Sequence, residues 1–217
     1  MKEKDDTRDQ ILAAARERFW HYGYGKTTMA EIARDCDMSP GNLYRFFEGK
    51  LDLAEEIAKA ASVETMNELA RAIRAPGKSA TQALRDYLFG KLRMTYTRLE
   101  KDPKIIELAQ TVSAERPQFS NDLLERERHI LMEIIANGRE LGEFATNDVR
   151  FTAEMLQSAT MKFSYPQLWS RLTLDNLERE LSGVFDLVLG GLCPDRTLFV
   201  GGSRPDPEGS GSVRQSV

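Results

Sequence analysis

The chain has 217 residues, of which 41% are hydrophobic and 29% are charged, and its formal net charge is −4. This length and composition are typical of a soluble globular protein with one large domain or two small ones. No run of 18 or more apolar residues is present, and the charged N-terminus is not followed by an apolar segment. We therefore expect neither a membrane span nor a secretory signal. The expected location is the cytoplasm.

The negative net charge, taken alone, argues against a protein that binds nucleic acid. A DNA-binding protein, however, needs cations only on the face that meets the phosphates, so the net charge does not exclude one. The two cysteines, Cys36 and Cys193, lie far apart in the sequence, and the two histidines, His21 and His129, are isolated. Neither pair has the spacing of a disulfide framework or of a metal site, so we expect no metal and no cofactor.

The first expected helix begins at the capping box Thr7-Arg8-Asp9-Gln10, in which side chains at both ends of the box satisfy free backbone amides. Apolar residues then recur at helical spacing, and two glycines in the segment 22–25 end the helix. Its apolar positions are Ile11, Leu12, Ala15 and Phe19.

Two short helix signals follow between residues 28 and 47. Thr28 and Glu31 form a second capping box, which predicts that a helix begins at Thr28. Ser39 is a good N-cap and Pro40 suits the first helical position, so another helix is expected over residues 40–47. Two short helices joined by a turn of three to four residues form a helix-turn-helix, whose second helix enters the major groove of DNA.

The rest of the chain carries helical patterns, and no segment shows sustained period-two alternation. We therefore predict an all-α chain. The composition changes after Pro194, and a stretch rich in glycine, serine and proline over 201–212 cannot bury enough apolar surface to form a core. The remaining helices are expected to begin near residues 51, 79, 103, 117, 147 and 173.

Residues 27–53 read TTMAEIARDCDMSPGNLYRFFEGKLDL and resemble the DNA-binding signature of the tetracycline-repressor (TetR) family. The turn Cys36-Asp37-Met38 replaces the family's common Ala-Gly-Val, and Phe46 replaces a frequent phosphate-contacting histidine. Aspartate tolerates the left-handed conformation, so the turn is expected to form without glycine. The matching residues are Thr27, Thr28, Ile32, Ala33, Ser39, Leu43, Tyr44, Phe47, Lys50 and Leu53.

The resemblance implies an N-terminal three-helix DNA-binding domain over residues 1–50. It further implies a C-terminal helical domain over 51–193 for effector binding and dimerisation. The composition of the segment 194–217 predicts a disordered tail. The function expected is that of a sequence-specific transcriptional repressor that binds a palindromic operator as a homodimer and is released by a small molecule. The alternative is a DNA-binding protein of the same fold that responds to a protein partner. An enzyme is not expected, because no catalytic constellation is visible.

Eight residues are expected to contact double-stranded DNA. Asn42 suits adenine, Arg45 suits guanine or a phosphate, and Gly41 lets the backbone approach closely. Hydroxyls and an ammonium group hold phosphates and set the register without reading sequence. The expected phosphate contacts are Thr27, Thr28, Tyr44 and Lys50, and the expected groove-facing residues are Pro40, Gly41, Asn42 and Arg45.

The last helix carries an apolar stripe at nearly heptad spacing. In the TetR family the final helices commonly pack against their copies in a second subunit, which makes this stripe the expected dimer interface. The alternative is that the stripe faces its own domain. Its residues are Leu174, Leu177, Leu181, Val184, Phe185, Val188 and Leu192.

The expected effector is a small apolar or aromatic molecule, held in the core of the second domain. Methionine and aromatic side chains are the candidate lining, although such residues at helical spacing are more often ordinary core. The candidates are Met66, Tyr87, Phe89, Met94, Tyr96, Met155, Phe163 and Trp169.

Overall fold

The computed structural model describes residues 2–74, 77–101, 104–164 and 172–193. These residues form helices joined by turns, which confirms the all-α prediction. Trp169 and the expected tail lie outside the described residues. The helices are α1 (Lys2–Tyr22), α2 (Met29–Asp35), α3 (Pro40–Leu43), α4 (Lys50–Ile73), α5 (Ala80–Lys101), α6 (Lys104–Glu115), α7 (Pro117–Glu140), α8 (Val149–Ala159), α9 (Met161–Ser164) and α11 (Leu174–Leu192).

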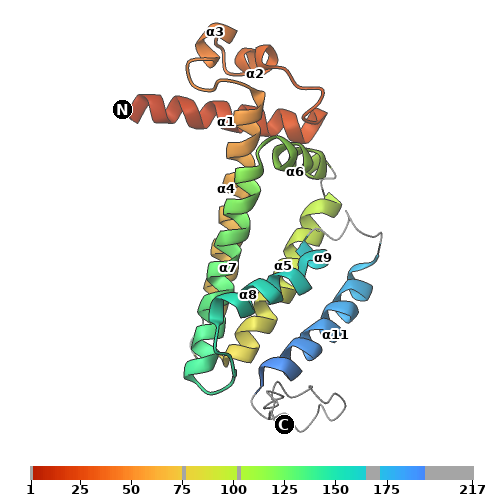
Figure 1. Cartoon of the computed structure of the whole chain (residues 1–217). Coiled ribbons are helices and arrows are strands. Elements are labelled where there is room, and N and C mark those ends of the chain that lie inside the picture. Colours follow the sequence, from red (N-terminus) through yellow and green to blue (C-terminus); the bar gives the residue numbers. More distant parts are fainter. Residues whose placement is uncertain (1, 75–76, 102–103, 165–171, 194–217) are drawn as a thin grey trace, which may run out of the picture.

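The molecule is elongated, with α1, α2 and α3 gathered at one end (Figure 1). The long helices α4 and α7 run along the molecule, and α5, α8, α9 and α11 form the other end. Helix α6 lies directly below α1, where the two ends meet. Among the described helices, none is both long and apolar enough to cross a membrane.

Helix starts follow the capping residues that the sequence predicts. The side chains of Thr28, Ser39, Asp148 and Thr173 each accept a backbone N–H of the helix that follows them. The predicted start at Thr7 is wrong, because α1 already begins at Lys2. The preceding residues are charged and mostly good helix formers, so they extend the helix without a cap.

Two clusters of buried apolar side chains form the cores. The first joins α1, α2 and α3 to the first turns of α4 and to Leu108 and Val112 of α6. The second joins α5, α7, α8, α9 and α11 to the end of α4. Because the first core draws on α4 and α6, it extends beyond residue 50, and the domain boundary stays a prediction.

The expected dimer seam on α11 packs against its own domain. Leu177, Leu181, Phe185 and Leu192 are buried, and the other members of the stripe, Leu174, Val184 and Val188, pack against the same core. The four buried residues are not available to a second subunit, so their assignment to the dimer interface is wrong, whereas that of the partly buried Leu174, Val184 and Val188 stays a prediction. The sequence pattern identifies an apolar face, but α5 covers that face within the chain.

The turn after α7 closes tightly onto the helix. Gly142 has a φ of +74°, and the amides of Glu143 and Phe144 donate to the carbonyl oxygen of Gly138 at 2.8 and 3.0 Å. The Phe144 ring is buried directly over Gly138, where a Cβ atom would lie 2.2 Å from Cδ2 of the ring. The position therefore has no room for a side chain.

Candidate nucleic-acid interface and effector core

The helix-turn-helix is built from α2, a short turn and α3. Thr28 and Glu31 form a complete capping box: Glu31 N–H donates to Thr28 Oγ1, and Thr28 N–H donates to Glu31 Oε2 at 2.9 Å. The Thr28 hydroxyl also donates to Glu31 Oε2 at 2.8 Å, and this hydrogen bond, followed by that from the Thr28 amide, lowers the pKa of Glu31. Asp37 lies in the turn with a φ of 53°, so an aspartate adopts the left-handed conformation as expected.

Helix α3 is shorter than the expected 40–47. Its α-helical part ends at Leu43, and the next amides bond three residues back, Arg45 to Asn42 and Phe46 to Leu43. This tighter pattern is that of a 3₁₀ turn. The chain therefore still presents a compact rod up to Phe46, but with one α-helical turn rather than two.

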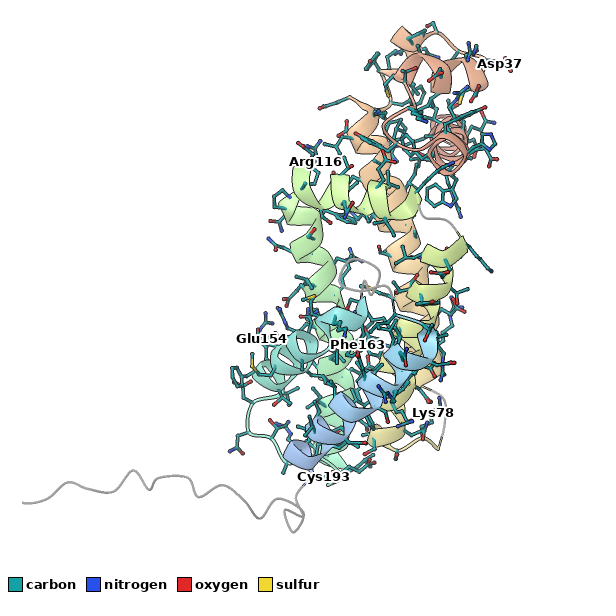
Figure 2. All side chains as sticks on the ribbon, turned by 90° about the vertical axis from the view of Figure 1, so that its right-hand side faces the viewer. Asp37, Lys78, Arg116, Glu154, Phe163 and Cys193 are labelled. Carbon is teal, nitrogen blue, oxygen red and sulfur yellow. The ribbon has the colours of Figure 1, made fainter. Side chains whose placement is uncertain are left out.

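The outer face of α3 is open. Pro40, Gly41, Tyr44 and Arg45 are exposed, and Asn42 is half-buried. A Cβ atom added at Gly41 would meet nothing within 4 Å. Five of the eight expected DNA contacts thus form one accessible surface at the tip of the molecule, near Asp37 in Figure 2.

Thr27 is not on that surface. It is 1% exposed, its hydroxyl donates to the carbonyl oxygen of Gly23 at 2.9 Å, and its amide donates to Tyr24 O. The expectation that Thr27 holds a phosphate is therefore wrong. Thr28 is exposed, but its hydroxyl already donates to Glu31 at 2.8 Å. Both threonines stabilise the start of α2.

Lys50 also has a structural role. Its ammonium donates to Tyr24 O at 2.7 Å and to Thr27 O at 2.8 Å, and lies 4.2 Å from the centroid of the Tyr24 ring. Burial lowers the pKa of Lys50. Two of its three N–H groups hold the turn between α1 and α2, so only the third is left for a phosphate.

Replacing Thr27 by valine tests this assignment. The substitution keeps the shape but removes a buried hydrogen bond, so the free energy of unfolding should fall by about 1 kcal/mol. DNA affinity should not change when both proteins are folded. Denaturant unfolding and fluorescence polarisation with duplex DNA measure the two quantities. Loss of DNA affinity without loss of stability would instead show a phosphate contact.

Ion pairs fix the helix-turn-helix to its neighbours. The guanidinium group of Arg18 pairs with Asp35 of α2, and the pairing lowers the pKa of that carboxyl group. Arg8 of α1 makes a two-pronged contact with Glu56 of α4 at 2.6 and 2.7 Å and lies over the Phe47 ring. These contacts hold α1, α2 and the start of α4 as one body.

Helix α6 and the turn that follows it contact α1, the turn after α1 and the start of α4. The Lys104 ammonium donates to the carbonyl oxygens of Trp20 and His21 at the end of α1, and the Glu107 carboxylate accepts from Gly25 N at 2.9 Å. Arg116, at the corner between α6 and α7, reaches Asp52 at 2.9 Å and Glu55 at 3.1 Å on α4. Helix α6 is thus a direct mechanical link between the two ends of the molecule.

The expected effector-lining residues differ in how deeply they are buried. Tyr87, Phe89 and Phe163 are buried in the second core, and Met66, Met94 and Tyr96 are partly buried. Met155 is 47% exposed, so its assignment to a buried pocket is wrong. It occupies the outer face of α8, whose periodicity places it opposite the buried Ala153 and Leu156.

A group of polar side chains lies within the second core, and sequence reasoning missed most of it. The Lys91 ammonium pairs with the Glu127 carboxylate and donates to Ser164 Oγ at 2.8 Å. Gln157 Nε2 donates to Glu127 Oε2 at 3.0 Å, and the Tyr87 hydroxyl also bonds to Glu127. Burial and the charge of Glu127 raise the pKa of Tyr87. We call these five residues the polar core.

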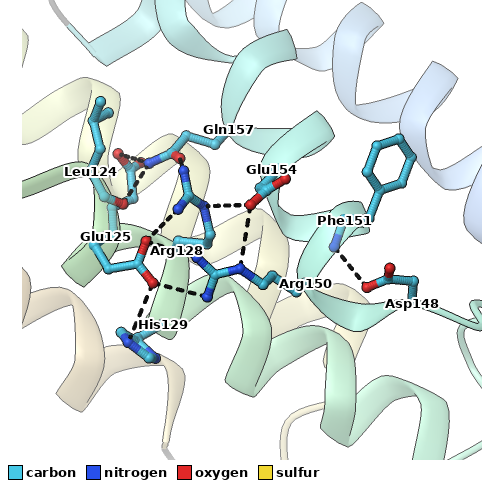
Figure 3. Close-up of polar contacts among 10 residues, drawn as sticks. Leu124, Glu125, Arg128, His129, Asp148, Arg150, Phe151, Glu154 and Gln157 are labelled. Atoms are coloured by element: carbon cyan, nitrogen blue, oxygen red, sulfur yellow. Dashed lines mark hydrogen bonds and ion pairs between the residues drawn. The ribbon is translucent and has the colours of Figure 1, made fainter. Parts of the chain in front are cut away.

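A second network flanks the polar core between α7 and α8 (Figure 3). Arg128 donates to Gln157 Oε1 at 3.3 Å and pairs with Glu125 and with Glu154, the latter at 3.7 Å. Arg150 bridges the same two carboxylates at 3.0 and 3.4 Å. Two cations and two carboxylates balance, so the network adds no net charge beside the polar core.

The cysteines and histidines form no site among the residues that the structure describes. Cys36 and Cys193 are both free thiols, and burial raises the pKa of Cys36. His21 is exposed, and His129 pairs with Glu125 at 3.7 Å. Within the described ranges, no three His, Cys, Asp or Glu side chains are grouped as metal ligands.

Comparison with solved structures supports the fold. The chain is similar to SmeT, the repressor of the Stenotrophomonas maltophilia multidrug efflux pump SmeDEF, with a TM-score of 0.61, 20% identity, and coverage of 93% of this chain and 97% of SmeT. It is also similar to the fatty acid degradation regulator FadR from Bacillus halodurans, with a TM-score of 0.63, 20% identity, and coverage of 85% and 95%. At this identity the likeness shows the fold alone.

Comparison of sequences gives evidence beyond the fold. The transcriptional regulator QacR of Staphylococcus aureus is 27% identical over 161 residues, which cover 70% of this chain and 81% of QacR. The regulator TtgR of Pseudomonas putida is 35% identical over 71 residues, so the chain spans about a third of its length. Residues 11–57 match the family model for bacterial regulatory proteins of the tetR family, and residues 80–185 match that for the tetracyclin repressor-like C-terminal domain. With both its DNA-binding and its C-terminal segments matched, the chain belongs to the TetR family of DNA-binding transcriptional regulators.

Proposed function

We propose that the protein is a repressor that binds a palindromic operator as a homodimer and leaves it when a small molecule binds the C-terminal core. The observation that carries the proposal is the open face of α3, joined through α6 to a separate helical core. One such face covers too few base pairs to be selective, whereas two faces related by a twofold axis read two half-sites about 34 Å apart or a multiple of that distance.

The link through α6 supports ligand control. A molecule that shifts α7 or α5 should also shift α6, which holds the end of α1 and Gly25 in the turn before α2. The two faces of a dimer then lose the spacing that the groove repeat requires. A differential affinity of about 1–3 kcal/mol between the two spacings changes operator occupancy 5- to 150-fold. A relative of the same fold, SmeT, has been solved as a complex with triclosan.

The decisive experiment is selection of genomic DNA fragments by the purified full-length protein, followed by footprinting of the retained fragments. The proposal predicts two protected half-sites related by inverted symmetry. Protection of a single half-site, or retention of no fragment at low salt, would contradict it.

Two substitutions on the open face of α3 should have different effects. Arg45→Ala should lower affinity for the selected operator about tenfold and relax the preference at one base pair, because arginine reads guanine in the major groove. Tyr44→Phe removes a phosphate contact and should weaken binding to every sequence alike. Polarisation against single-base variants of the operator distinguishes these outcomes. Arg139→Ala, at an exposed site on α7, is the control and should change neither.

The proposed dimer surface is the outer side of α8 and α11, which occupy the same half of the molecule (Figure 2). Phe151 is 56% exposed, Met155 47% and Leu187 66%. Gly183 and Gly191 lie one helical turn on either side of Leu187, and a Cβ atom added at either would meet nothing within 4 Å. Small residues flanking an exposed leucine allow another helix to approach closely.

Leu187→Glu should therefore raise the dissociation constant of the dimer at least tenfold, because it places a charge in an apolar contact. Analytical ultracentrifugation over a concentration series measures the constant. Leu141→Glu is a matched control, since Leu141 is 59% exposed in the turn after α7 and lies outside the proposed surface. Equal dimer stability in both variants would place the interface elsewhere.

A further inference from the structure

The acceptors of the polar core are already occupied. One oxygen of Glu127 accepts from Lys91, and its carboxylate also accepts from Gln157 and Tyr87. The amide nitrogen of Gln157 donates to Leu124 O and to Glu127, both at 3.0 Å, while its oxygen accepts from Arg128. The two polar side chains on α7 and α8 are thus satisfied by each other and by their neighbours.

Two donors of the polar core have no acceptor among the residues that the structure describes. An ammonium group has three N–H bonds, and Lys91 uses one on Glu127 and one on Ser164. The Ser164 hydroxyl accepts from Lys91, and within the described part of the chain its own proton has no acceptor. The two atoms are 2.8 Å apart, so one oxygen atom can accept from both.

The two donors lie at the edge of an apolar core, where Lys91 is partly exposed and Ser164 is buried beside it. The Lys91 side chain is 19% exposed, whereas that of Glu127 is only 7% exposed. Phe163, next to Ser164, and Leu88, on the turn of α5 before Lys91, are buried in the surrounding cluster. A ligand that reaches Lys91 from solvent therefore meets two hydrogen-bond donors against an apolar background.

The charges around the polar core determine whether it can accept a charged or an uncharged ligand oxygen. Lys91 and Glu127 neutralise each other, and the flanking network of Arg128, Arg150, Glu125 and Glu154 is balanced as well. A carboxylate ligand would add an uncompensated negative charge close to Glu127 in a poorly solvated core, which is costly. An uncharged oxygen adds none.

We propose that the polar core is the recognition site for an uncharged, mainly apolar effector, whose carbonyl oxygen accepts from the Lys91 ammonium and the Ser164 hydroxyl. This inference rests on the proposed function, because it assigns the chemistry of the molecule that releases the DNA. Tyr87, Glu127 and Gln157 are positioning residues that hold Lys91 in place.

The test uses three probes of the same shape on the full-length protein: 2-acetylnaphthalene, 2-isopropenylnaphthalene, in which a methylene group replaces the carbonyl oxygen, and 2-naphthoate. Isothermal titration calorimetry should show that the ketone binds about tenfold more tightly than the alkene and the carboxylate, since one charge-assisted hydrogen bond is worth about that ratio. Ser164→Ala should reduce the preference, and Lys91→Met should abolish it.

The double variant Lys91→Met/Glu127→Gln guards against a folding defect, because it leaves no unpaired charge. It should be folded by circular dichroism and should bind the ketone and the alkene equally. Lys162→Met, which removes an outer lysine paired with Glu180, is the control and should keep the full preference.

Three results would overturn the inference: tighter binding of the naphthoate, an unchanged ketone preference in the Lys91 variants, or no ketone binding up to its solubility limit. Operator binding is measured separately on the same preparations. Loss of operator binding with an intact ketone preference would count against the proposed function, whereas the reverse would count only against this site.

Discussion

Replacing Lys91 by methionine is expected to lower the free energy of unfolding by about 3 kcal/mol or more. Methionine fills similar volume, so the loss comes from the Glu127 carboxylate, which is left in the core without its cation. Breaking a buried ion pair on one side typically costs about 3–5 kcal/mol. Guanidinium unfolding followed by circular dichroism measures the change.

Two controls identify the cause of this loss. Lys162→Met breaks an ion pair whose side chains are 40% and 38% exposed, so it should cost about 0–1 kcal/mol. The double variant Lys91→Met/Glu127→Gln should recover most of the stability, because no charge is left unpaired. A double variant as unstable as the single one would show that packing, rather than charge, accounts for the loss.

The second large effect is expected at Gly138. In an open helix, replacing glycine by alanine stabilises by about 0.5–1 kcal/mol. At Gly138 the new methyl group would lie 2.2, 2.6 and 2.8 Å from three atoms of the buried Phe144 ring, so the ring must move. Such overpacking costs about 1–3 kcal/mol, and we expect Gly138→Ala to lower the free energy of unfolding by about 2 kcal/mol.

Gly41→Ala provides the comparison within the same chain. Gly41 lies in α3, outside the proposed dimer surface, and a Cβ atom there would meet nothing within 4 Å. Thermal and denaturant unfolding without DNA should therefore place the Gly41 variant at or above the wild type and the Gly138 variant well below it. If both variants gain stability, Phe144 does not pack on Gly138 in solution.

Local features of the fold were predictable because their causes are local. A capping threonine acts on an amide three residues away, so Thr28 and Thr173 mark helix starts in the sequence itself. The left-handed Asp37 was predictable for the same reason. Membership of the TetR family followed from the same stretch, since the helix-turn-helix signature is continuous in sequence.

The features that failed depend on which neighbour covers a residue. The stripe on α11 was recognised as apolar, but periodicity does not say whether α5 or a second subunit covers it. Thr27 bears a phosphate-binding hydroxyl, yet the chain folds back so that the carbonyl oxygen of Gly23 accepts from it first. The polar core brings together Lys91 and Ser164, which are 73 positions apart in the sequence. No rule based on sequence spacing predicts a contact over that separation.

The contacts that hold α1 separate two determinants of DNA recognition: the sequence of each half-site and the distance between half-sites. Glu56 holds Arg8 in the first half of α1, and Lys104 holds the end of the helix, so we expect α1, α2 and α3 to tilt together without changing their internal arrangement. In the proposed dimer, the base sequence of each half-site then depends on α3, whereas the distance between half-sites depends on the contacts of α1 with Glu56 and Lys104. Exchanging the residues of α3 would retarget such a protein while leaving its response to a small molecule intact.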